Sequence, residues 1–267
     1  MKFSSVYILL AAVLLGISSV GICQSNTFEG WKSIEFEFQG HNAKIVFPKK
    51  SNDGKFWIWR ARFWGHEPQL DKALLEKGFH VVYVDVAGLY GNKEAVQIWN
   101  DFYAYLIAQY NLNRKAVLEG MSRGGLIVYN WASENTEKVA CIYADAPVCD
   151  IKSWPGGLYS GSGSTSDWEA CLKAYHLDEK SVLNFENIPI NNCVEVAKAG
   201  VPTIHVCGLA DDVVPYSENT EKLATNFKAA GGEIELILKE GVGHHPHSLE
   251  DPQPLVDFIL KNTTQKR

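Results

Sequence analysis

The sequence lacks the excess of basic side chains that nucleic-acid-binding proteins need. Its 25 lysines and arginines are outnumbered by 31 aspartates and glutamates, which gives a formal net charge of −6 at pH 7. Proteins bind phosphate backbones through clustered positive charge, so this balance argues against a nucleic-acid partner. A basic amphipathic segment that would lie on a membrane surface is also missing.

The glycine fingerprint of dinucleotide-binding proteins is missing as well. No G-x-G-x-x-G follows an early strand, and the glycine cluster that is present follows a later one. The fingerprint lets a backbone turn approach a pyrophosphate closely, so its absence disfavours a cofactor-dependent oxidoreductase. No cofactor is therefore expected.

Long apolar runs are confined to the start of the chain. After a basic residue, Val6–Leu15 is almost wholly apolar, and small residues follow it before Gln24. This pattern predicts a signal peptide over residues 1–23 and a secreted or periplasmic protein, because the run is too short for a membrane span. A lipoprotein anchored at Cys23 is the alternative, which the bulky Ile22 before it disfavours.

Five cysteines follow the predicted signal peptide. Cys141 and Cys207 fall inside predicted strands, so we expect them to be buried thiols. Cys149, Cys171 and Cys193 lie in the least regular region, where an exported protein would form one disulfide. The sequence does not choose the pair.

Strand-like and helix-like stretches alternate along the rest of the chain. We predict an α/β domain over residues 24–267, with a mostly parallel sheet of about eight strands flanked by helices. The predicted strands are 33–38, 43–47, 55–62, 80–86, 115–118, 139–148, 203–209 and 233–239, the first two forming an antiparallel pair. The predicted helices are 68–78, 94–110, 126–131, 217–230 and 254–262.

One long segment breaks this alternation. Residues 149–200 separate the sixth and seventh predicted strands, which a single helix would normally connect. Insertions of this length in a compact fold are usually lids or binding loops. We therefore predict a cap over an active site.

A Gly-x-Ser-x-Gly motif stands between the fifth predicted strand and the helix that follows it. The motif is Gly120-Met121-Ser122-Arg123-Gly124. Between a strand and a helix it is typical of a nucleophile elbow, a turn so tight that glycines must flank the serine. The elbow would expose the Ser122 hydroxyl and aim the Arg123 amide at the same point.

A serine hydroxyl becomes a good nucleophile only with a base beside it and a third group that orients the base. Candidates follow the last two predicted strands. The first loop reads Gly208-Leu209-Ala210-Asp211-Asp212-Val213-Val214-Pro215, and the second reads Gly243-His244-His245-Pro246-His247. The chain order Ser, Asp, His is that of α/β-hydrolases.

Through these three motifs, residues 31–264 resemble serine esterases of the α/β-hydrolase fold. The resemblance implies that Ser122 is the nucleophile, His244 the general base and Asp211 the acid that orients it. Asp211 is favoured over Asp212 because the family's acid usually falls three residues after the loop glycine. Asp145 also stays open, since some members place the acid after the preceding strand.

The other loop histidines have several possible roles. We expect His245 and His247 to bond loop backbone or shape the site, and we place His245 among the substrate-binding residues. Three imidazoles could bind zinc. Neighbouring residues of one loop rarely converge on one ion, however, so no metal is expected.

The oxyanion hole needs a second amide besides that of Arg123. In the family it comes from the loop after the third strand, where the common His-Gly pair is absent here. Arg62 stands at this point, so we predict its amide as the second donor.

Side chains around the predicted site suggest a substrate. Arg123 resembles the arginine after the serine in glucuronoyl esterases, where it could grip a carboxylate; alternatively it pairs with Glu119 or Asp145. Arg60, with Trp64, Trp154 and Trp168, would suit an acidic or acylated sugar. Trp57 and Trp59 are expected in the core.

These features predict an exported carboxylic-ester hydrolase acting on acyl or methyl esters of sugars or polysaccharides. A serine peptidase of the prolyl oligopeptidase type is the alternative, disfavoured by the lack of a propeller domain. A catalytically inactive fold that serves as a binding module is a third hypothesis, disfavoured by the intact Ser122, Asp211 and His244. The sequence does not predict the oligomeric state.

Overall fold

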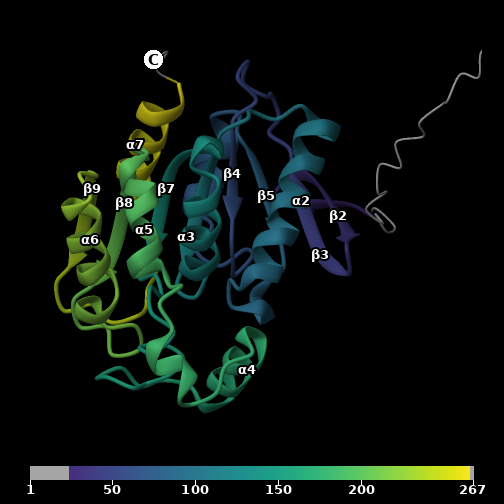
Figure 1. The fold of residues 1–267 in the computed structure, drawn as a ribbon. Helices are drawn as coiled ribbons and strands as arrows, with labels where there is room; N and C mark the ends of the chain where they lie inside the picture. Colours follow the sequence, from purple (N-terminus) through teal and green to yellow (C-terminus); the bar gives the residue numbers. More distant parts are fainter. Residues whose placement is uncertain (1–23, 265–267) are drawn as a thin grey trace, which may run out of the picture.

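The computed structural model describes residues 24–264, which form an α/β fold around one nine-stranded sheet (Figure 1). The predicted signal peptide and Cys23 lie outside the described residues. The spatial order of the strands is β1-β2-β3-β5-β4-β6-β7-β8-β9. Their bounds are β1 Gln24–Phe28, β2 Trp31–Phe38, β3 His41–Val46, β4 Trp57–Arg60, β5 His80–Val84, β6 Ala116–Met121, β7 Val139–Asp145, β8 Thr203–Gly208 and β9 Ile234–Lys239.

The pairing confirms the predicted fold class. Strands β1, β2, β3 and β5 pair antiparallel in succession, and all the pairings from β5 through β4 to β9 are parallel. Strand β1 was not predicted; it is an edge strand whose residues are almost all exposed. Such a strand buries no face, so it shows no alternation of apolar and polar residues.

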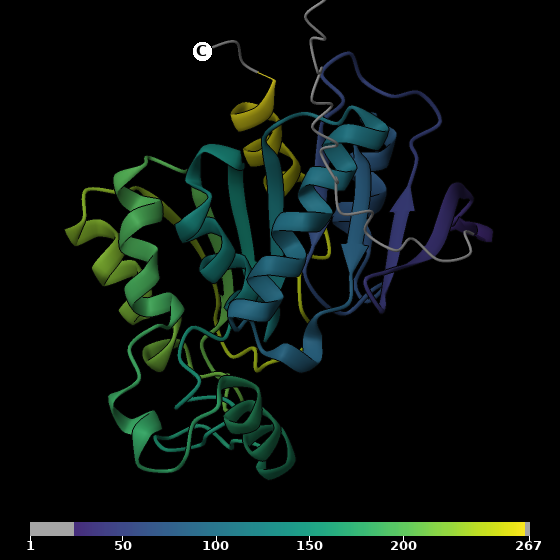
Figure 2. The same ribbon diagram turned by 45° about the vertical axis from the view of Figure 1, so that its right-hand side comes forward.

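Helices cover both faces of the sheet (Figures 1 and 2). Buried side chains of α2, α3, α5 and α6 pack on one face, and those of α1 and α7 pack on the other. The bounds are α1 Gln69–Glu76, α2 Lys93–Tyr110, α3 Gly124–Glu134, α4 Thr165–Tyr175, α5 Pro189–Lys198, α6 Thr220–Ala229 and α7 Gln253–Thr263. Short 3₁₀ turns occur at Ala87–Leu89, Thr136–Lys138, Ser181–Asn184 and Tyr216–Glu218.

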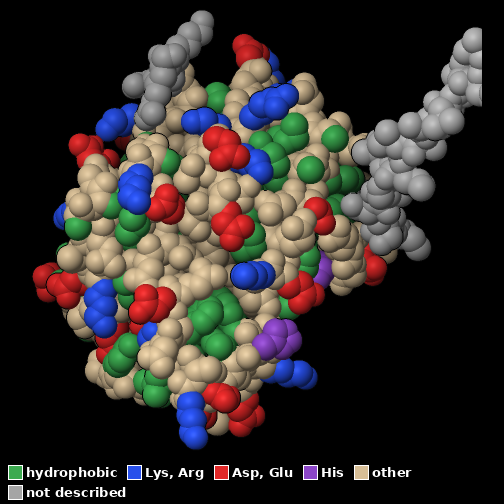
Figure 3. Space-filling view, in the orientation of Figure 1, with side chains coloured by type: hydrophobic (Ala, Val, Ile, Leu, Met, Phe, Trp, Pro, Cys, Tyr) green, Lys and Arg blue, Asp and Glu red, His purple; other side chains and the backbone are tan. Residues whose placement is uncertain are grey.

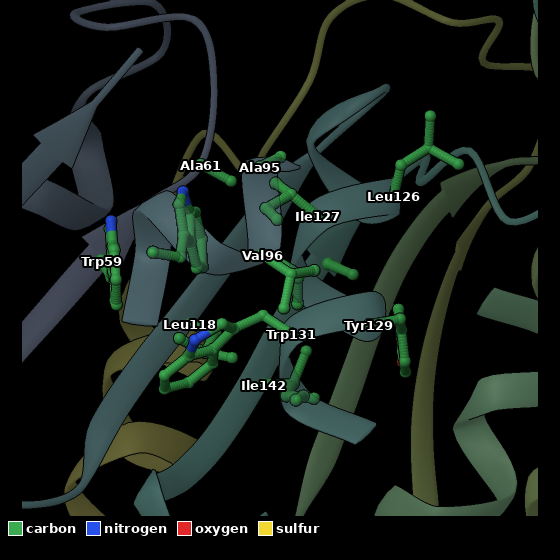
Figure 4. Close-up of a cluster of buried hydrophobic side chains, with 14 of the residues drawn as sticks. Trp59, Ala61, Ala95, Val96, Leu118, Leu126, Ile127, Tyr129, Trp131 and Ile142 are labelled. Atoms are coloured by element: carbon green, nitrogen blue, oxygen red, sulfur yellow. The ribbon is translucent and has the colours of Figure 1, made fainter. Parts of the chain in front are cut away.

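The larger core lies between the sheet and α2 and α3 (Figure 4). The predicted core positions Trp57 and Trp59 are fully buried, and the Trp59 ring stacks on Trp99 with 3.9 Å between centroids. Trp131 meets both rings edge-on. Burying one large apolar side chain stabilises a fold by roughly 1.5–3 kcal/mol, so this cluster anchors the strands that carry the site.

Residues 149–200 divide between two places. Helix α5 packs against α3 and α6 and completes the helical layer of the sheet. The part that carries α4 lies beyond the carboxyl ends of the parallel strands, at the bottom of Figures 1 and 2. Below, the cap means residues 150–188.

The predicted disulfide is wrong. All five cysteines of the described chain are free and buried. Cys171 belongs to α4 and Cys193 to α5, where each fills a core position as a small apolar side chain. Burial raises the pKa of Cys171, Cys193 and Cys207 to about 12, so these thiols are not poised as nucleophiles.

Figure 3 shows the charged side chains on one face of the molecule. On the side shown in Figure 3, acidic and basic side chains are interspersed, and neither kind forms a continuous stripe. Within residues 24–264, no helix is both long and apolar enough to cross a bilayer.

Candidate active site

Ser122 stands at the turn between β6 and α3. Its φ of 49° is in the left-handed region, which a side chain rarely adopts and which is typical of a nucleophile elbow. The Ser122 amide donates to the Asp145 carbonyl at 2.8 Å, and the Ser122 carbonyl accepts from Val148. A Cβ at Gly125 would lie 2.6 Å from Pro147 Cβ, so only glycine lets the turn approach the neighbouring strand's end this closely.

A chain of hydrogen bonds links the predicted triad. His244 Nε2 lies 3.0 Å from Ser122 Oγ, and His244 Nδ1 lies 2.7 Å from Asp211 Oδ2. The other carboxylate oxygen of Asp211 accepts from the amides of Val213 and Val214 at 2.9 and 2.8 Å. These amides fix the carboxylate, and no such contact with the histidine occurs for Asp212.

The loop after β8 and the loop after β9 meet to bring Asp211 and His244 together. Gly208 ends β8, and its Cα lies so close to the carbonyls of Val242 and Gly243 that a side chain would collide with them. The Ala210 amide also donates to the Val242 carbonyl at 2.9 Å. The glycine therefore allows the histidine loop to lie directly against the aspartate loop.

Arg62 and Arg123, the predicted oxyanion-hole residues, lie on two loops that meet at the elbow. Strand β4 ends at Arg60, so Arg62 is in the following loop as predicted, and a Cβ at Gly124 would be 3.2 Å from Arg62 Cβ. Within residues 24–264, no group accepts a hydrogen bond from the amide of Arg62 or of Arg123. Two free amides therefore flank the start of α3, beside Ser122.

The prediction that Arg60 binds substrate is wrong. Its side chain is 1% exposed and donates to Asp71 Oδ2 at 2.6 Å and to Glu119 Oε1 at 3.1 Å. It also donates to the carbonyls of Arg62, Phe63 and His66. Helices cover both faces of the sheet at β4, so the Arg60 side chain is buried beneath α1, where its guanidinium holds the loop that follows β4.

Arg123 pairs with neither of its predicted partners. Its guanidinium donates to Asp167 Oδ1 in α4 at 2.9 Å and lies 5.6 Å from the ring centroids of Tyr90 and Trp154. Tyr90 donates to the same Asp167 oxygen at 2.6 Å. The residue after Ser122 therefore joins the elbow to the cap.

This cap contact favours a charged Asp167. Burial raises the pKa of Asp167, but hydrogen bonds from Tyr90 and Ser164 and the charge of Arg123 outweigh burial and lower it.

The predicted tryptophans differ in their access to the site. Trp154 lies half-buried beside Arg123, and Trp64 lines a cavity of about 340 Å³ next to His244. Trp168 is 8% exposed and donates to Glu179 Oε1 at 2.9 Å within the cap. Its assignment to the substrate surface is therefore wrong, because the apolar face of α4 packs inward.

The loop histidines converge more than the sequence suggested. One ring nitrogen from each of His244, His245 and His247 lies within 4.8 Å of the others, and His66 approaches from the oxyanion loop. His247 Nδ1 bonds Asp145 Oδ1 at 2.6 Å, which the sequence analysis missed. Burial and the neighbouring imidazoles lower the pKa of His245.

The family profile for the prolyl oligopeptidase family matches residues 87–265, well over half of the chain. No curated protein matches the sequence closely enough to count as a relative.

Among solved structures, the acylaminoacyl peptidase of Pyrococcus horikoshii is similar, with a TM-score of 0.66 and 14% identity over 92% of this chain and 42% of that one. A Mycobacterium tuberculosis puromycin-hydrolyzing peptidase is similar with a TM-score of 0.64 and 13% identity over 92% and 40%. An S-formylglutathione hydrolase from Agrobacterium tumefaciens reaches 0.65 with 14% identity over 91% and 99%.

The chain thus spans about two fifths of the two peptidases and nearly all of the S-formylglutathione hydrolase. At these identities the structural matches establish the fold, which is that of the α/β-hydrolases. The profile match establishes the family. The chain belongs to the prolyl oligopeptidase family.

Proposed function

We propose that this protein is a serine hydrolase that cleaves carboxylic esters through an acyl-enzyme on Ser122. The observation that carries the proposal is the continuous hydrogen-bonded chain from Ser122 through His244 to Asp211. In this arrangement Asp211 holds the Nδ1–H tautomer of His244. The Nε2 lone pair then faces the serine hydroxyl.

The reaction follows from these positions. Ser122 Oγ attacks the ester carbonyl while its proton passes to His244 Nε2, and Asp211 stabilises the imidazolium. When the tetrahedral intermediate collapses, the alcohol leaves with that proton. A water then gives a proton to His244 and attacks the acyl-enzyme, and the second collapse returns the proton to Ser122 and releases the acid.

The free amides of Arg62 and Arg123 would stabilise the negative oxygen of both tetrahedral intermediates. Removing one donor from such a site typically costs about 10²–10³ in turnover. Because Arg60 holds the carbonyls of Arg62 and Phe63, it acts as a positioning residue for this donor.

As the ester substrate we propose a sugar or polysaccharide that carries acyl or methyl ester groups. Support comes from Trp64, which lines the cavity beside His244, and from Trp154, whose ring centroid lies 5.6 Å from the guanidinium of Arg123. Aromatic faces next to a guanidinium suit sugar rings that bear acidic or acylated groups. The burial of Arg60 and Trp168 leaves these three residues to carry this part of the proposal.

The test is hydrolysis of p-nitrophenyl acetate by the wild type and by Ser122→Ala, followed by a screen of acetylated and methyl-esterified polysaccharides. We expect activity from the wild type and a loss of about 10⁶-fold in the variant, with an unchanged circular dichroism spectrum. Equal turnover by both proteins would overturn the assignment of Ser122.

Peptide hydrolysis is the second candidate, favoured by the family match and by two peptidases among the similar structures. The same triad can attack an amide. Turnover of N-acylated and free aminoacyl p-nitroanilides, compared with p-nitrophenyl esters of the same acids, separates the two activities. Anilide turnover matching that of the ester would favour the peptidase.

We also propose export, on the signal-peptide pattern of residues 1–23. Mass spectrometry of protein produced in an exporting host should then find a mature chain that begins at Gln24.

A further inference from the structure

Four histidines surround one cavity beside the candidate nucleophile. The cavity of about 340 Å³ is lined by Phe63, Trp64 and the rings of His66, His244, His245 and His247. Ring centroids of the last three lie 4.7–5.2 Å apart, and one nitrogen from each lies within 4.8 Å of the others. The hydrolytic mechanism uses only His244, so the convergence of the others needs a separate explanation.

Two of these rings already have the orientation of metal-binding histidines. His244 and His247 each direct Nδ1 to a carboxylate, Asp211 at 2.7 Å and Asp145 at 2.6 Å. A ring that donates its Nδ1 hydrogen to a carboxylate keeps a lone pair on Nε2, and this carboxylate–histidine arrangement recurs in zinc sites.

The Asp145 end of the second pair is rigid. Asp145 is 1% exposed, and its other oxygen accepts from the Ser248 amide at 2.8 Å and from the Tyr143 hydroxyl at 3.0 Å. These bonds fix Asp145, and Asp145 in turn fixes the orientation of the buried His247 ring.

The third ring is free to adjust. His245 is exposed, and its ring nitrogens make no hydrogen bond to any residue of 24–264. Tetrahedral zinc with Zn–N bonds near 2.0–2.1 Å needs nitrogens about 3.3 Å apart. The nitrogens therefore have to approach one another by up to about 1.5 Å, for which the unbonded His245 ring can rotate and the loop that carries all three rings can adjust, with His66 or a solvent molecule in the fourth position.

We propose that His244, His245 and His247 bind one divalent transition-metal ion, with zinc as the representative, and that this ion inhibits the enzyme. The ion takes the Nε2 lone pair of His244, which otherwise accepts the proton of Ser122. Metal binding and proton transfer therefore exclude each other. Binding is independent of the proposed function, whereas the inhibition depends on it.

The experiment uses zinc chloride and the whole chain. Isothermal titration of Ser122→Ala measures binding without any reliance on activity, and cobalt(II) in the same protein reports tetrahedral coordination through its visible absorption. We expect one ion per chain, removable by EDTA. His245→Gln and His247→Gln should weaken binding at least tenfold, whereas His176→Gln, an exposed histidine after α4, should not.

The inhibition is read from the ratio of activity with and without zinc in each variant, and from labelling of Ser122 by a fluorophosphonate. We expect saturating zinc to reduce the hydrolytic activity and the fluorophosphonate labelling at least tenfold, in the wild type and in His176→Gln. In His245→Gln the same zinc concentration should have little effect.

Absence of binding to Ser122→Ala, or equal binding by His245→Gln, would overturn the metal site. His245 is exposed, so this variant should fold even if His247→Gln does not. Binding at one site with undiminished fluorophosphonate labelling would overturn the inhibition. If the protein hydrolysed no ester or amide but bound zinc as expected, the proposed function would fail while the site stood.

Discussion

Replacing Arg60 with methionine keeps most of the side-chain volume but removes the buried positive charge between two carboxylates. Both partners are buried: the side chain of Asp71 is 1% exposed and that of Glu119 is 2% exposed. The free energy of unfolding should fall, because no solvent reaches the group that loses its partner.

The magnitude depends on the protonation of the cluster. Burial, together with the charge of Asp71, raises the pKa of Glu119 well above its ordinary value despite the attraction of Arg60. A proton on Glu119 also provides a donor between Glu119 Oε2 and Asp71 Oδ1, which otherwise have no partner. With that proton in place the cluster holds one positive and one negative charge, and Arg60→Met leaves the Asp71 carboxylate without a cation, at a cost of about 3–5 kcal/mol.

Glu119→Gln is the matched control. Glutamine reproduces a protonated glutamate, so below the ordinary glutamate pKa the free energy of unfolding should change by less than about 1 kcal/mol, and at pH 7 the variant should be at least as stable as the wild type. The wild type should behave differently as pH rises. A raised folded-state pKa means that the contribution of Glu119 is present below the unfolded pKa and is lost as pH rises through the folded value. The glutamine variant should not show this loss.

Urea unfolding followed by tryptophan fluorescence measures both variants. Arg60→Met should also lower kcat for p-nitrophenyl acetate, because three loop carbonyls around Arg62 lose their donor. A loss of stability below 1 kcal/mol in Arg60→Met, or equal damage in Glu119→Gln, would refute the charge assignment.

Three further outcomes are expected. Asp211→Asn should lower kcat by about 10⁴, as loss of the orienting acid does in serine proteases, whereas Asp212→Asn should stay within a few-fold of the wild type in the same assay. The five thiols of the described chain should resist Ellman's reagent in the native state and react together on unfolding in urea. Because the pKa of Asp167 is lowered, its charged form stabilises the docked cap at every pH above the ordinary aspartate pKa, and this stabilisation is lost as pH falls through the lowered value. Limited proteolysis within residues 150–188 should therefore become faster in that low pH range. The acceleration should be smaller in Asp167→Asn.

The parallel strands and the elbow could be predicted because their signals are local. Buried runs such as His80–Val84 are rich in valine and contain no Asp, Glu, Lys or Arg, and the elbow needs its glycines within five positions. The edge strand Gln24–Phe28 has no such signal, since neither of its faces is buried.

The partners of charged residues could not be predicted, because they depend on contacts distant in sequence. Arg60 meets Glu119 across 59 positions, and Arg123 meets Asp167 across 44. A charged side chain in a strand looks the same in sequence whether it lines a site or is buried in a neutral cluster. Only the burial of Arg60 distinguishes the two cases.

The choice of the acid shows how far the sequence could go. Asp145 was an alternative to Asp211, and the fold in fact contains two Asp–His pairs, with His244 and His247 4.7 Å apart between ring centroids. Asp145 ends β7 and Asp211 follows β8, and both bond a histidine of the same loop. Of the two histidines, only His244 hydrogen-bonds the Ser122 hydroxyl, which makes Asp211 the acid paired with the candidate nucleophile. Within the described residues, no serine hydroxyl bonds the Asp145–His247 pair, and His247 Nε2 has no hydrogen-bond partner. This nitrogen lies near His244, and the zinc titration tests whether it binds a metal ion.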